Sequence, residues 1–538
     1  MTHYRMNQQT RIVVLQLAVI VGVCAFLFFF GLGAFGLVGT DEPRYCQIAR
    51  EMFNRHDWVV PTLNGQPWLE KPALLYWKIM NSYAIFGVHD WAARIPAAVH
   101  ATTLVLVVFF FMRRFRPGAE MATALITASS AAVIAFARGA STDMLLSAPF
   151  SMGMLAWWAW HESGKKLWLA TFFALLALGT LAKGPVAPAL AVLLVAAYAL
   201  LRRDGKIFLR SLWWPGLLLF FLIALPWYVA VQLKVPQFFR VFLLEHNLAR
   251  FGTNLYQHSQ PFWYYVPVFL LSTLPWIAFT IMALVDAGGS SFRSLKAAAT
   301  TSADDDRLPQ FLLIWILVPI LFFSISRSKL PGYILPSIPA AAILTADYLY
   351  RRTRPLSRWM IMLHSLICGA LLGGALVAPS KMLKVQLPQN AVSWIIVGTG
   401  LIAILVVLVL RIGGTRMLHL ATLVPVMVAL SFLLRPAAPV IDELNSARAV
   451  DARLNQAGAP HDPISVFEVK RDVEYGLNFY RNEPIGRYER DGVPAEAHVV
   501  IIKAGSSDAL KALLGPRQIL PLADFPPQRL EFYLVSKR

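Results

Sequence analysis

The sequence predicts a polytopic α-helical membrane protein with a small α/β domain at its C-terminal end. Of the 538 residues, 57% are hydrophobic and only 15% are charged, and the mean hydropathy is +0.56. A soluble protein of this size could not shield so much apolar surface from water. Apolar runs of membrane-spanning length recur as far as residue 434, and beyond Arg435 an ordinary mixture of polar and apolar residues begins.

The basic residues between the apolar runs indicate which runs cross the membrane. The first run, residues 12–38, has no small-residue cleavage site after it and predicts a retained helix. Arg5 and Arg11 place the N-terminus in the cytoplasm. The run at 72–88 is short and contains Lys78, so we expect it to lie in the membrane interface. About 13 transmembrane helices remain, and they bring these basic clusters to the cytoplasmic side: Arg113/Arg114/Arg116, Lys165/Lys166, Arg202/Arg203/Lys206/Arg210, Arg293/Lys296, Arg351/Arg352/Arg354/Arg358 and Arg411/Arg416.

This topology divides the chain into two predicted domains. Residues 1–435 form a transmembrane domain with periplasmic loops at 39–92 and 235–261, and residues 436–538 form a periplasmic α/β domain. The pattern of the second domain predicts helices and short strands. The helices are expected at 443–456 and 506–514, and the strands at 464–468, 498–503 and 529–535.

The formal net charge of +19 belongs to the apolar part of the chain. Residues 436–538 contain 13 Lys and Arg against 14 Asp and Glu, so they contribute none of the excess. Positive charge in short loops between spans follows the orientation rule of membrane proteins. Because no basic stripe with stacking aromatics is present, we expect contact with inner-membrane lipids and no nucleic-acid binding.

The first periplasmic loop opens with an acidic pair, Asp41 and Glu42, followed by Arg44. Thr40 can cap a helix at this point, and an acid at a helix start suits the helix dipole. That structural explanation accounts for one carboxylate. Two adjacent acids followed by an arginine, where the chain leaves the bilayer, favour a functional site.

Cations on the same predicted face contradict the charge bias that the other loops obey. Arg138, Lys183 and Lys329 are the clearest of them, and they favour an anionic ligand such as a phosphate. Snorkelling at the membrane edge is the alternative for Lys183. For the dipeptide of Glu70 and Lys71, which precedes a proline, an exposed turn is an equally good interpretation.

Two histidines lie in the loop at 235–261. His246 and His258 are candidates for polar or metal contacts, and solvated loop histidines are at least as good an interpretation of either one alone. Trp263, Tyr264 and Tyr265, which follow, are typical of the aromatic belt at a membrane surface.

Several motifs together resemble the polyprenyl-phosphate-dependent glycosyltransferases with the GT-C membrane fold, which include the protein O-mannosyltransferases. The acidic pair alone is a weak signal, but the longer pattern is similar to the lipid A aminoarabinose transferases over about residues 10–350. The motifs are Asp41 to Arg44, Trp58 to Pro61, Asn64-Gly65, Glu70-Lys71-Pro72, Tyr76-Trp77, Lys183-Gly184-Pro185, His258-Ser259-Gln260-Pro261 and Ser328-Lys329-Leu330-Pro331.

The resemblance implies an enzyme, a pentosyltransferase of the bacterial inner membrane that works with inversion at the periplasmic face. The donor would be undecaprenyl phosphate carrying 4-amino-4-deoxy-L-arabinose, and the acceptor a phosphate of lipid A, a modification that confers polymyxin resistance. The alternative within the same class is a protein or lipid O-mannosyltransferase. A transporter is disfavoured, because the sequence indicates neither paired interrupted helices nor internal duplication.

The resemblance also implies roles for individual residues. Asp41 would be the catalytic carboxylate, with Asp143 as a second acid and Glu42 as a third candidate. An acceptor phosphate needs little general-base help, so Asp41 would orient the acceptor, contact the sugar amine or stabilise an oxocarbenium-like transition state. The carrier phosphate would be held by Arg44, Lys71, Lys183, Lys329 and Tyr333. A divalent metal ion, with zinc as the candidate, would lie near Glu70 and His258.

Overall fold

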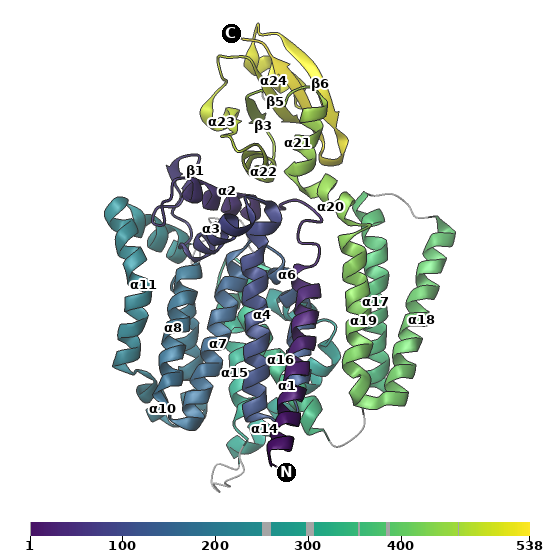
Figure 1. Cartoon of the computed structure of the whole chain (residues 1–538). Helices are drawn as coiled ribbons and strands as arrows, with labels where there is room; N and C mark the ends of the chain where they lie inside the picture. The colour runs from purple at the N-terminus through teal and green to yellow at the C-terminus, as the bar shows by residue number, and fades with distance from the viewer. Residues whose placement is uncertain are drawn as a thin grey trace.

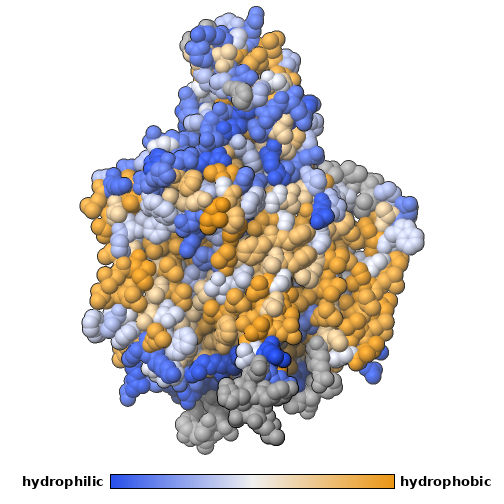
Figure 2. Space-filling model, in the orientation of Figure 1, coloured by the Kyte–Doolittle hydropathy of each residue, from blue (hydrophilic) through white to orange (hydrophobic). Residues whose placement is uncertain are grey.

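Long apolar helices make up most of the molecule, because helices satisfy their own backbone hydrogen bonds where no water is available. The computed structural model describes residues 2–249, 260–296, 306–352, 356–383, 388–460 and 462–537. Figure 1 shows a bundle of roughly parallel helices, with the C-terminal sheet domain standing on one end of it. Figure 2 shows an apolar band across the visible face of the bundle and hydrophilic residues at both of its ends.

In the described part of the chain, seven helices are long and apolar enough to cross a membrane, or ten if each of three bent pairs counts as one span. The chain is therefore a multi-pass membrane protein. The seven are Thr10–Phe29 (α1 with η1), α4 (Asp90–Phe115), α8 (Lys166–Lys183), α11 (Trp214–Lys234), α15 (Leu308–Ile325), α17 (Arg358–Leu383) and α18 (Gln389–Gly413).

Three further helices pack inside the same bundle. Of these, α7 (Thr142–Ser163) packs against α4 and α8, α9 (Val186–Leu201) against α8 and α15, and α16 (Ile338–Arg351) against α5, α14 and α15. Added to the ten, they make the 13 helices of the predicted topology. The number of crossings itself stays a prediction, because these three helices are not among those that are both long and apolar enough to span a membrane.

Two of the bent pairs correct the expectation that the chain has no interrupted helices. Helix α5 (Glu120–Ser129) turns by 62° into α6 (Ala131–Ala137), and η3 with α13 (Phe262–Ser272) turns by 118° into α14 (Ile277–Lys296). The two breaks lie against each other, because Ala131 donates its backbone N–H to the carbonyl of Leu274 at 2.8 Å. The indole of Trp276 donates to the Ser129 hydroxyl at 2.8 Å. The first contact satisfies a backbone donor and acceptor at the breaks, the second joins side chains across them, and an apolar run gives no sign of either.

The third bent pair leads from the bundle into the C-terminal domain. Helix α19 (Leu418–Leu434) turns by 52° into α20 (Ala438–Asn445). Figure 1 places α20 between α17 and α19 below it and the sheet domain above it. The remaining short elements are α10 (Gly205–Ser211), η2 (Arg240–Ala249), η4 (Pro331–Ser337), η5 (Gly414–Met417), α23 (Tyr488–Asp491) and η6 (Pro526–Gln528).

The segment at 72–88 does not form a spanning helix, which agrees with its predicted place in the interface. Helix α3 (Leu74–Phe86) lies with α2 (Asp41–Asn54) across the end of the bundle (Figure 1). Between them a small hairpin pairs β1 (Thr62–Leu63) with β2 (Gln66–Pro67). The buried side chains of α3, among them Tyr76 and Ile79, pack against α2 and α4.

The C-terminal domain is a five-stranded sheet in the order β4-β3-β5-β7-β6. Strand β3 pairs in parallel with β4 and β5, and β7 pairs antiparallel with β5 and β6. All five predicted elements of this region are present, as β3 (Ile464–Phe467), β5 (His498–Lys503), β7 (Leu530–Val535), α21 (Ala447–Gln456) and α24 (Ser507–Leu514). The sequence missed β4 (Gly486–Arg487), β6 (Ile519–Phe525) and α22 (Arg471–Arg481).

Cysteine labelling tests whether α3 crosses the membrane. Gln66 and His89 are exposed on either side of α3, and Arg114 is exposed at the far end of α4. The native cysteines are all buried and should stay silent. In intact cells an impermeant maleimide should react with Gln66→Cys and His89→Cys and should not react with Arg114→Cys. Labelling of only one of the first two variants would mean that α3 crosses.

Candidate active site

A buried ion pair between Glu42 and Arg94 fixes the first turn of α2. Arg94 lies inside α4 and is 1% exposed, and its Nε and Nη2 donate to the Glu42 carboxylate at 2.7 and 2.8 Å. The backbone N–H groups of Val38 and Ala140 donate to the same carboxylate, each at 2.9 Å. Arg94 also donates to the carbonyls of Leu32 (2.6 Å), Phe35 (2.9 Å) and Gly36 (2.8 Å). One side-chain pair thus joins α2, α4 and the segments around residues 32–38 and 140.

The charge state of Glu42 follows from these contacts. Burial by itself raises the pKa of Glu42, but the Arg94 guanidinium and the two backbone donors together hold it below its ordinary value of 4.5. A folded-state pKa below the unfolded value stabilises the fold above pH 4.5. This contribution is lost as the pH falls through the folded-state pKa.

Asp41, the neighbour of Glu42, points the other way and stays accessible. Its side chain is 54% exposed, and its Oδ1 accepts from Arg44 Nη2 at 2.6 Å, one turn along α2. Arg44 is in turn 3.4 Å from Glu70, and its guanidinium lies over the Trp68 ring at 4.9 Å. Three of the predicted site residues, Asp41, Arg44 and Glu70, are therefore in contact.

Arg44 stays charged in this setting. Burial lowers the pKa of Arg44, but the neighbouring Tyr45 and the carboxylates of Glu70 and Asp41 raise it well above its ordinary range. The guanidinium is nearly enclosed, and its Nε has no hydrogen-bond partner among the described residues. A buried donor without a partner is unfavourable, so this atom is available to an added acceptor such as a phosphate oxygen.

A second acid–base pair forms where α7, α8 and η4 meet. Lys183 at the end of α8 donates to the carboxylate of Asp143 at 2.5 Å, and its ammonium lies 4.9 Å from the centre of the Tyr333 ring. Gly332 makes this possible, because a Cβ there would lie 2.8 Å from Asp143 Oδ1. The structure therefore brings Asp143, Lys183 and Tyr333, three of the predicted site residues, together.

The segment 138–143 links the two groups. Ala140 donates its N–H to Glu42, and Asp143, three residues later, binds Lys183. Three residues of extended chain span at most about 11 Å, so the two acid–base groups belong to one region.

A cavity of about 830 Å³ opens beside the first group. Asp41, Glu42, Arg94 and Arg138 line its polar end. The remaining lining is mostly apolar and comes from α6, α17 and α19 and from both helix breaks, which contribute Ala131, Leu274 and Pro275. A charged end on an apolar chamber suits an amphipathic ligand.

The chain is similar to known proteins both in sequence and in fold. Residues 13–242 match the family described as dolichyl-phosphate-mannose-protein mannosyltransferase. The chain is 29% identical over 501 residues to the undecaprenyl phosphate-alpha-4-amino-4-deoxy-L-arabinose arabinosyl transferase of Aeromonas hydrophila, covering 86% of this chain and 88% of that relative. It is 31% identical over 365 residues to the undecaprenyl phosphate-alpha-4-amino-4-deoxy-L-arabinose arabinosyl transferase 2 of Pseudomonas fluorescens. This match covers 66% of this chain and 60% of that relative.

The solved structures agree in fold. ArnT from Cupriavidus metallidurans bound to undecaprenyl phosphate superimposes with a TM-score of 0.76 at 23% identity, covering 98% of both chains. Its apo state gives a TM-score of 0.73. The chain is similar to these arabinosyl transferases over most of its length. The expected GT-C membrane fold and the glycosyltransferase class are thereby confirmed.

The structure gives the other predicted residues of the site different surroundings. Lys329 is buried and donates to the carbonyl of Ser326 at 2.5 Å, so it holds the loop before η4. Lys71 is half-buried beside Glu70. Arg138 donates to the carbonyls of Leu27, Phe30 and Gly31 at 2.8–3.1 Å, and it therefore fastens the end of the first span.

The metal site stays a prediction. Glu70, the predicted ligand, is already in contact with Arg44, and His258 lies outside the described residues. Among the residues that the structure describes, no three His, Cys, Asp or Glu side chains gather as a metal would require. The described side chains therefore do not by themselves form a metal site, and no step of the reaction is derived through one.

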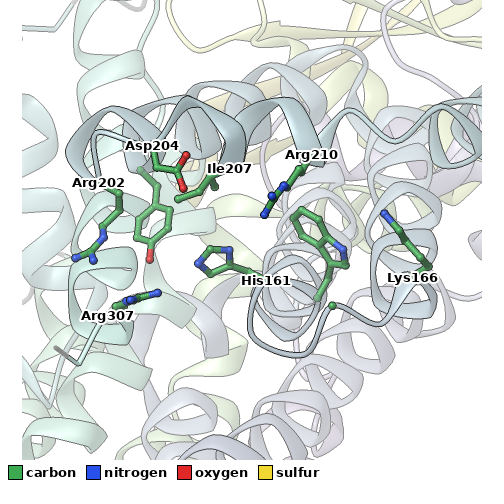
Figure 3. A pocket seen from close by; sticks show the side chains of 10 residues that line it. His161, Lys166, Arg202, Asp204, Ile207, Arg210 and Arg307 are labelled. Atoms are coloured by element: carbon green, nitrogen blue, oxygen red, sulfur yellow. The ribbon is translucent and has the colours of Figure 1, made fainter. Parts of the chain in front are cut away.

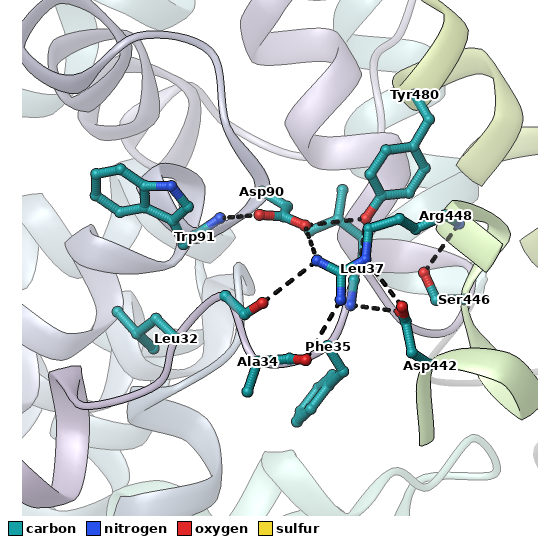
Figure 4. Close-up of polar contacts among 12 residues, drawn as sticks. Leu32, Ala34, Phe35, Leu37, Asp90, Trp91, Asp442, Ser446, Arg448 and Tyr480 are labelled. Carbon is teal, nitrogen blue, oxygen red and sulfur yellow. Dashed lines mark hydrogen bonds and ion pairs between the residues drawn. The ribbon is translucent and has the colours of Figure 1, made fainter. Parts of the chain in front are cut away.

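Sequence reasoning missed Arg94 and the whole docking surface of the C-terminal domain. An arginine within an apolar run needs a partner, and this could have indicated Arg94. In the docking surface, Figure 4 shows Arg448, Asp442 and Tyr480 of the C-terminal domain around Asp90 and the backbone of residues 32–37. Tyr480 accepts from the Leu37 N–H at 2.8 Å and donates to Asp90 at 3.2 Å. No local pattern reveals such long-range contacts.

Asp442 and Arg448 complete this docking surface. Asp442 accepts from the Gly36 N–H at 2.7 Å and from Arg448 Nε at 2.9 Å. Arg448 also reaches Asp90 at 3.3 Å. Because Gly36 and Leu37 lie only a few residues before Asp41, the C-terminal domain fixes the segment that leads into the site.

Substitution of Glu42 separates its role from that of Asp41. Glu42→Gln would place an amide N–H₂ against Arg94 or a backbone donor, and the buried guanidinium would lose its counter-charge. We expect a loss of about 3 kcal/mol or more in stability, seen as a lower melting temperature of the purified protein. The matched variant Asp41→Asn, on the neighbouring exposed side chain, should melt like the wild type. Equal melting of both variants would contradict the anchoring role.

Tyr480→Phe tests the docking surface with almost no change in shape. The variant leaves the Leu37 N–H without its acceptor, which costs about 1–3 kcal/mol for a buried donor. We expect a lower melting temperature and slower sugar transfer. The control is Tyr533→Phe, on the sheet of the same domain, whose hydroxyl bonds to Glu531 and Ser507 within that domain. Equal melting temperatures and equal transfer rates of the two variants would show that the docking contact contributes neither to stability nor to transfer.

Proposed function

We propose that this protein transfers 4-amino-4-deoxy-L-arabinose from undecaprenyl phosphate to a phosphate of lipid A. The observation that carries the proposal is the exposed Asp41 carboxylate, held beside Arg44 at the polar end of the amphipathic cavity. The supporting comparison is the likeness to arabinosyl transferases over 86% of the chain. An apolar chamber with charge at its mouth suits a lipid whose reacting group is a sugar phosphate.

The reaction is a single displacement at the anomeric carbon. An oxygen of the acceptor phosphate forms the new bond to C1 of the sugar, and the bond from C1 to the carrier phosphate oxygen breaks. The electron pair leaves with undecaprenyl phosphate, and the configuration inverts. Because the acceptor phosphate is ionised at neutral pH, no general base is needed.

Asp41 would supply a negative charge where positive charge develops. As the carrier leaves, the sugar ring gains oxocarbenium character, which a fixed carboxylate stabilises more in the transition state than in the ground state. The contact with Arg44 holds the carboxylate in one orientation. Glu42, whose oxygens are all bound, acts in this proposal as a positioning residue.

The cations would stabilise the leaving phosphate. Arg44 offers its unpartnered Nε, and Lys183 offers an ammonium set between Asp143 and the Tyr333 ring. Lys71, next to Glu70 in the sequence, is the third contributor. Charge-assisted hydrogen bonds of this kind strengthen as the phosphate dianion forms, which lowers the barrier to its departure. Lys329 would position the loop of Tyr333.

The site would face the periplasm of a bacterial inner membrane. The support is the distribution of charge, because Arg113, Lys166, Arg202 and Arg351 all lie at the end of the bundle opposite α2. The C-terminal domain stands on the α2 end and is then periplasmic as well (Figure 1).

Asp41→Asn isolates the charge of the carboxylate, since the two side chains are nearly equal in size and Asn is an equally good residue at a helix start. We expect transfer to fall by a factor on the order of 10² or more. The assay incubates purified protein with the lipid-linked aminoarabinose and lipid A and follows the product by mass spectrometry.

A second donor distinguishes the sugars. Transfer from polyprenyl-phosphate mannose, without transfer from the aminoarabinose donor, would replace the proposal with a mannosyltransferase. Wild-type activity of well-folded Asp41→Asn would remove Asp41 from the mechanism.

A further inference from the structure

Helix α22 of the C-terminal domain packs on α2, the helix that begins with the acidic pair of the candidate active site (Figure 1). Two polar contacts hold α22 there. Arg50 on α2 donates from Nη1 to the carbonyl of Phe479 at 2.7 Å, and Asn478 Nδ2 donates to Asn64 Oδ1 at 2.9 Å. These contacts are separate from the docking surface, so the C-terminal domain is attached to the region of the site at two places.

Two aromatic rings of α22 each lie against an arginine of α2. The guanidinium of Arg50 is 4.3 Å from the centre of the Phe479 ring, and the guanidinium of Arg44 is 5.7 Å from the centre of the Tyr475 ring. Tyr475 and Phe479 are four residues apart in α22 and therefore share one face of the helix. At both distances a cation is attracted to the face of an aromatic ring.

Arg44 is the arginine of these two that belongs to the candidate active site. Its guanidinium contacts the carboxylates of Asp41 and Glu70 at 2.6 and 3.4 Å and lies over the Trp68 ring at 4.9 Å. These three partners all lie within residues 41–70. Tyr475 adds a partner from the opposite end of the chain, and it brings the C-terminal domain into contact with a predicted phosphate-binding side chain.

The Tyr475 ring limits the movement of this guanidinium. Tyr475 is 9% exposed, and the side chain of Arg44 is 11% exposed. Burial alone would be served by an aliphatic side chain such as leucine, but only an aromatic ring presents a negative face to the cation. A long side chain loses rotamer freedom when it binds a ligand. A ring that already lies against Arg44 removes part of this cost before the ligand arrives, which raises the affinity.

We propose that Tyr475 is a positioning residue of the transfer site, which holds the Arg44 guanidinium in place for the phosphate of the lipid carrier. The inference rests on the proposed function, since it takes the carrier to be a polyprenyl phosphate. The C-terminal domain then contributes to carrier affinity through one side chain, in addition to fixing the segment before α2. The contact of Phe479 with Arg50 has the same geometry without this role, because Arg50 lies outside the predicted site.

The test measures binding of undecaprenyl phosphate, without a sugar, to the full-length protein in detergent. Tyr475→Leu removes the ring, Tyr475→Phe keeps it, and Phe479→Leu removes the neighbouring ring that lies over Arg50. We expect the dissociation constant of Tyr475→Leu to rise about twofold to thirtyfold, which corresponds to the loss of one cation–π contact. Tyr475→Phe and Phe479→Leu should bind like the wild type, even where Phe479→Leu lowers the melting temperature.

A second comparison asks whether Tyr475 acts through Arg44. In an Arg44→Gln background no cation is left for the ring to hold, so Tyr475→Leu should not weaken binding further. A further loss of the same size in that background would overturn the inference. Equal losses in Tyr475→Leu and Phe479→Leu would overturn it as well, because they would indicate a general effect of domain docking. A loss in Tyr475→Phe as large as in Tyr475→Leu would assign the effect to the hydroxyl and overturn the role of the ring.

If Tyr475→Leu does not fold, pentafluorophenylalanine is incorporated at position 475 in its place, because this side chain keeps the ring and removes the negative charge of its face. Its affinity for undecaprenyl phosphate should be lower than that of Tyr475→Phe, and equal affinity would overturn the inference. Wild-type protein that binds no undecaprenyl phosphate would overturn the proposed function and this inference with it. Binding by the wild type and equally by Tyr475→Leu would overturn the inference alone.

Discussion

The buried pair of Glu42 and Arg94 is the constraint on which the rest of the site depends. A charge inside an apolar bundle is costly unless every donor and acceptor around it is satisfied. Here the two side chains together bind four backbone carbonyl or amide groups between residues 32 and 38, and the amide of Ala140. The pair therefore fixes the exit of the first span, the start of α2 and the segment that leads to Asp143. Asp41 owes its exposed position to the fact that its neighbour is locked inward.

Both ends of the bundle contain cations that lie against carboxylates. At the end with α2, the cations Arg44 and Lys183 each lie against a carboxylate, which keeps them ordered while a phosphate is absent. At the other end, one cluster is neutralised by Glu120 and Asp347. A second cluster there lines the cavity shown in Figure 3 and consists of Lys166, Arg202, Arg210 and Arg307. Carboxylate partners pre-organise the site at the α2 end for a ligand that comes and goes.

Much of the site could be predicted from the sequence because its signals are local. Asp41, Glu42 and Arg44 are neighbours in the chain, and Lys183 stood out because its charge opposed the orientation rule. The role of Glu42 could not be predicted, because it depends on Arg94, more than fifty residues away. The bend between α5 and α6 was missed for the same reason, since Leu274 supplies the acceptor that makes it stable.

The fold of the C-terminal domain shows a similar limit. Strands β3, β5 and β7 have alternating or buried apolar residues and were predicted, whereas the edge strand β6 contains Pro521 and a register shift. Helix α22 is highly charged. Its apolar residues, such as Val473 and Leu477, are recognised as core residues only once the packing of the domain is known. The docking contacts of Tyr480 and Arg448 could not be predicted from the local sequence, because their partners lie in the first hundred residues of the chain.

A double-mutant cycle on the transfer rate tests the central claim most directly. Glu42→Gln, Arg94→Gln and the double variant are compared with the wild type below the melting temperature of each. If the pair acts as one unit that positions Asp41, the double variant should lose little more activity than either single variant. Losses that simply multiply would show that the two residues act independently and would contradict the account.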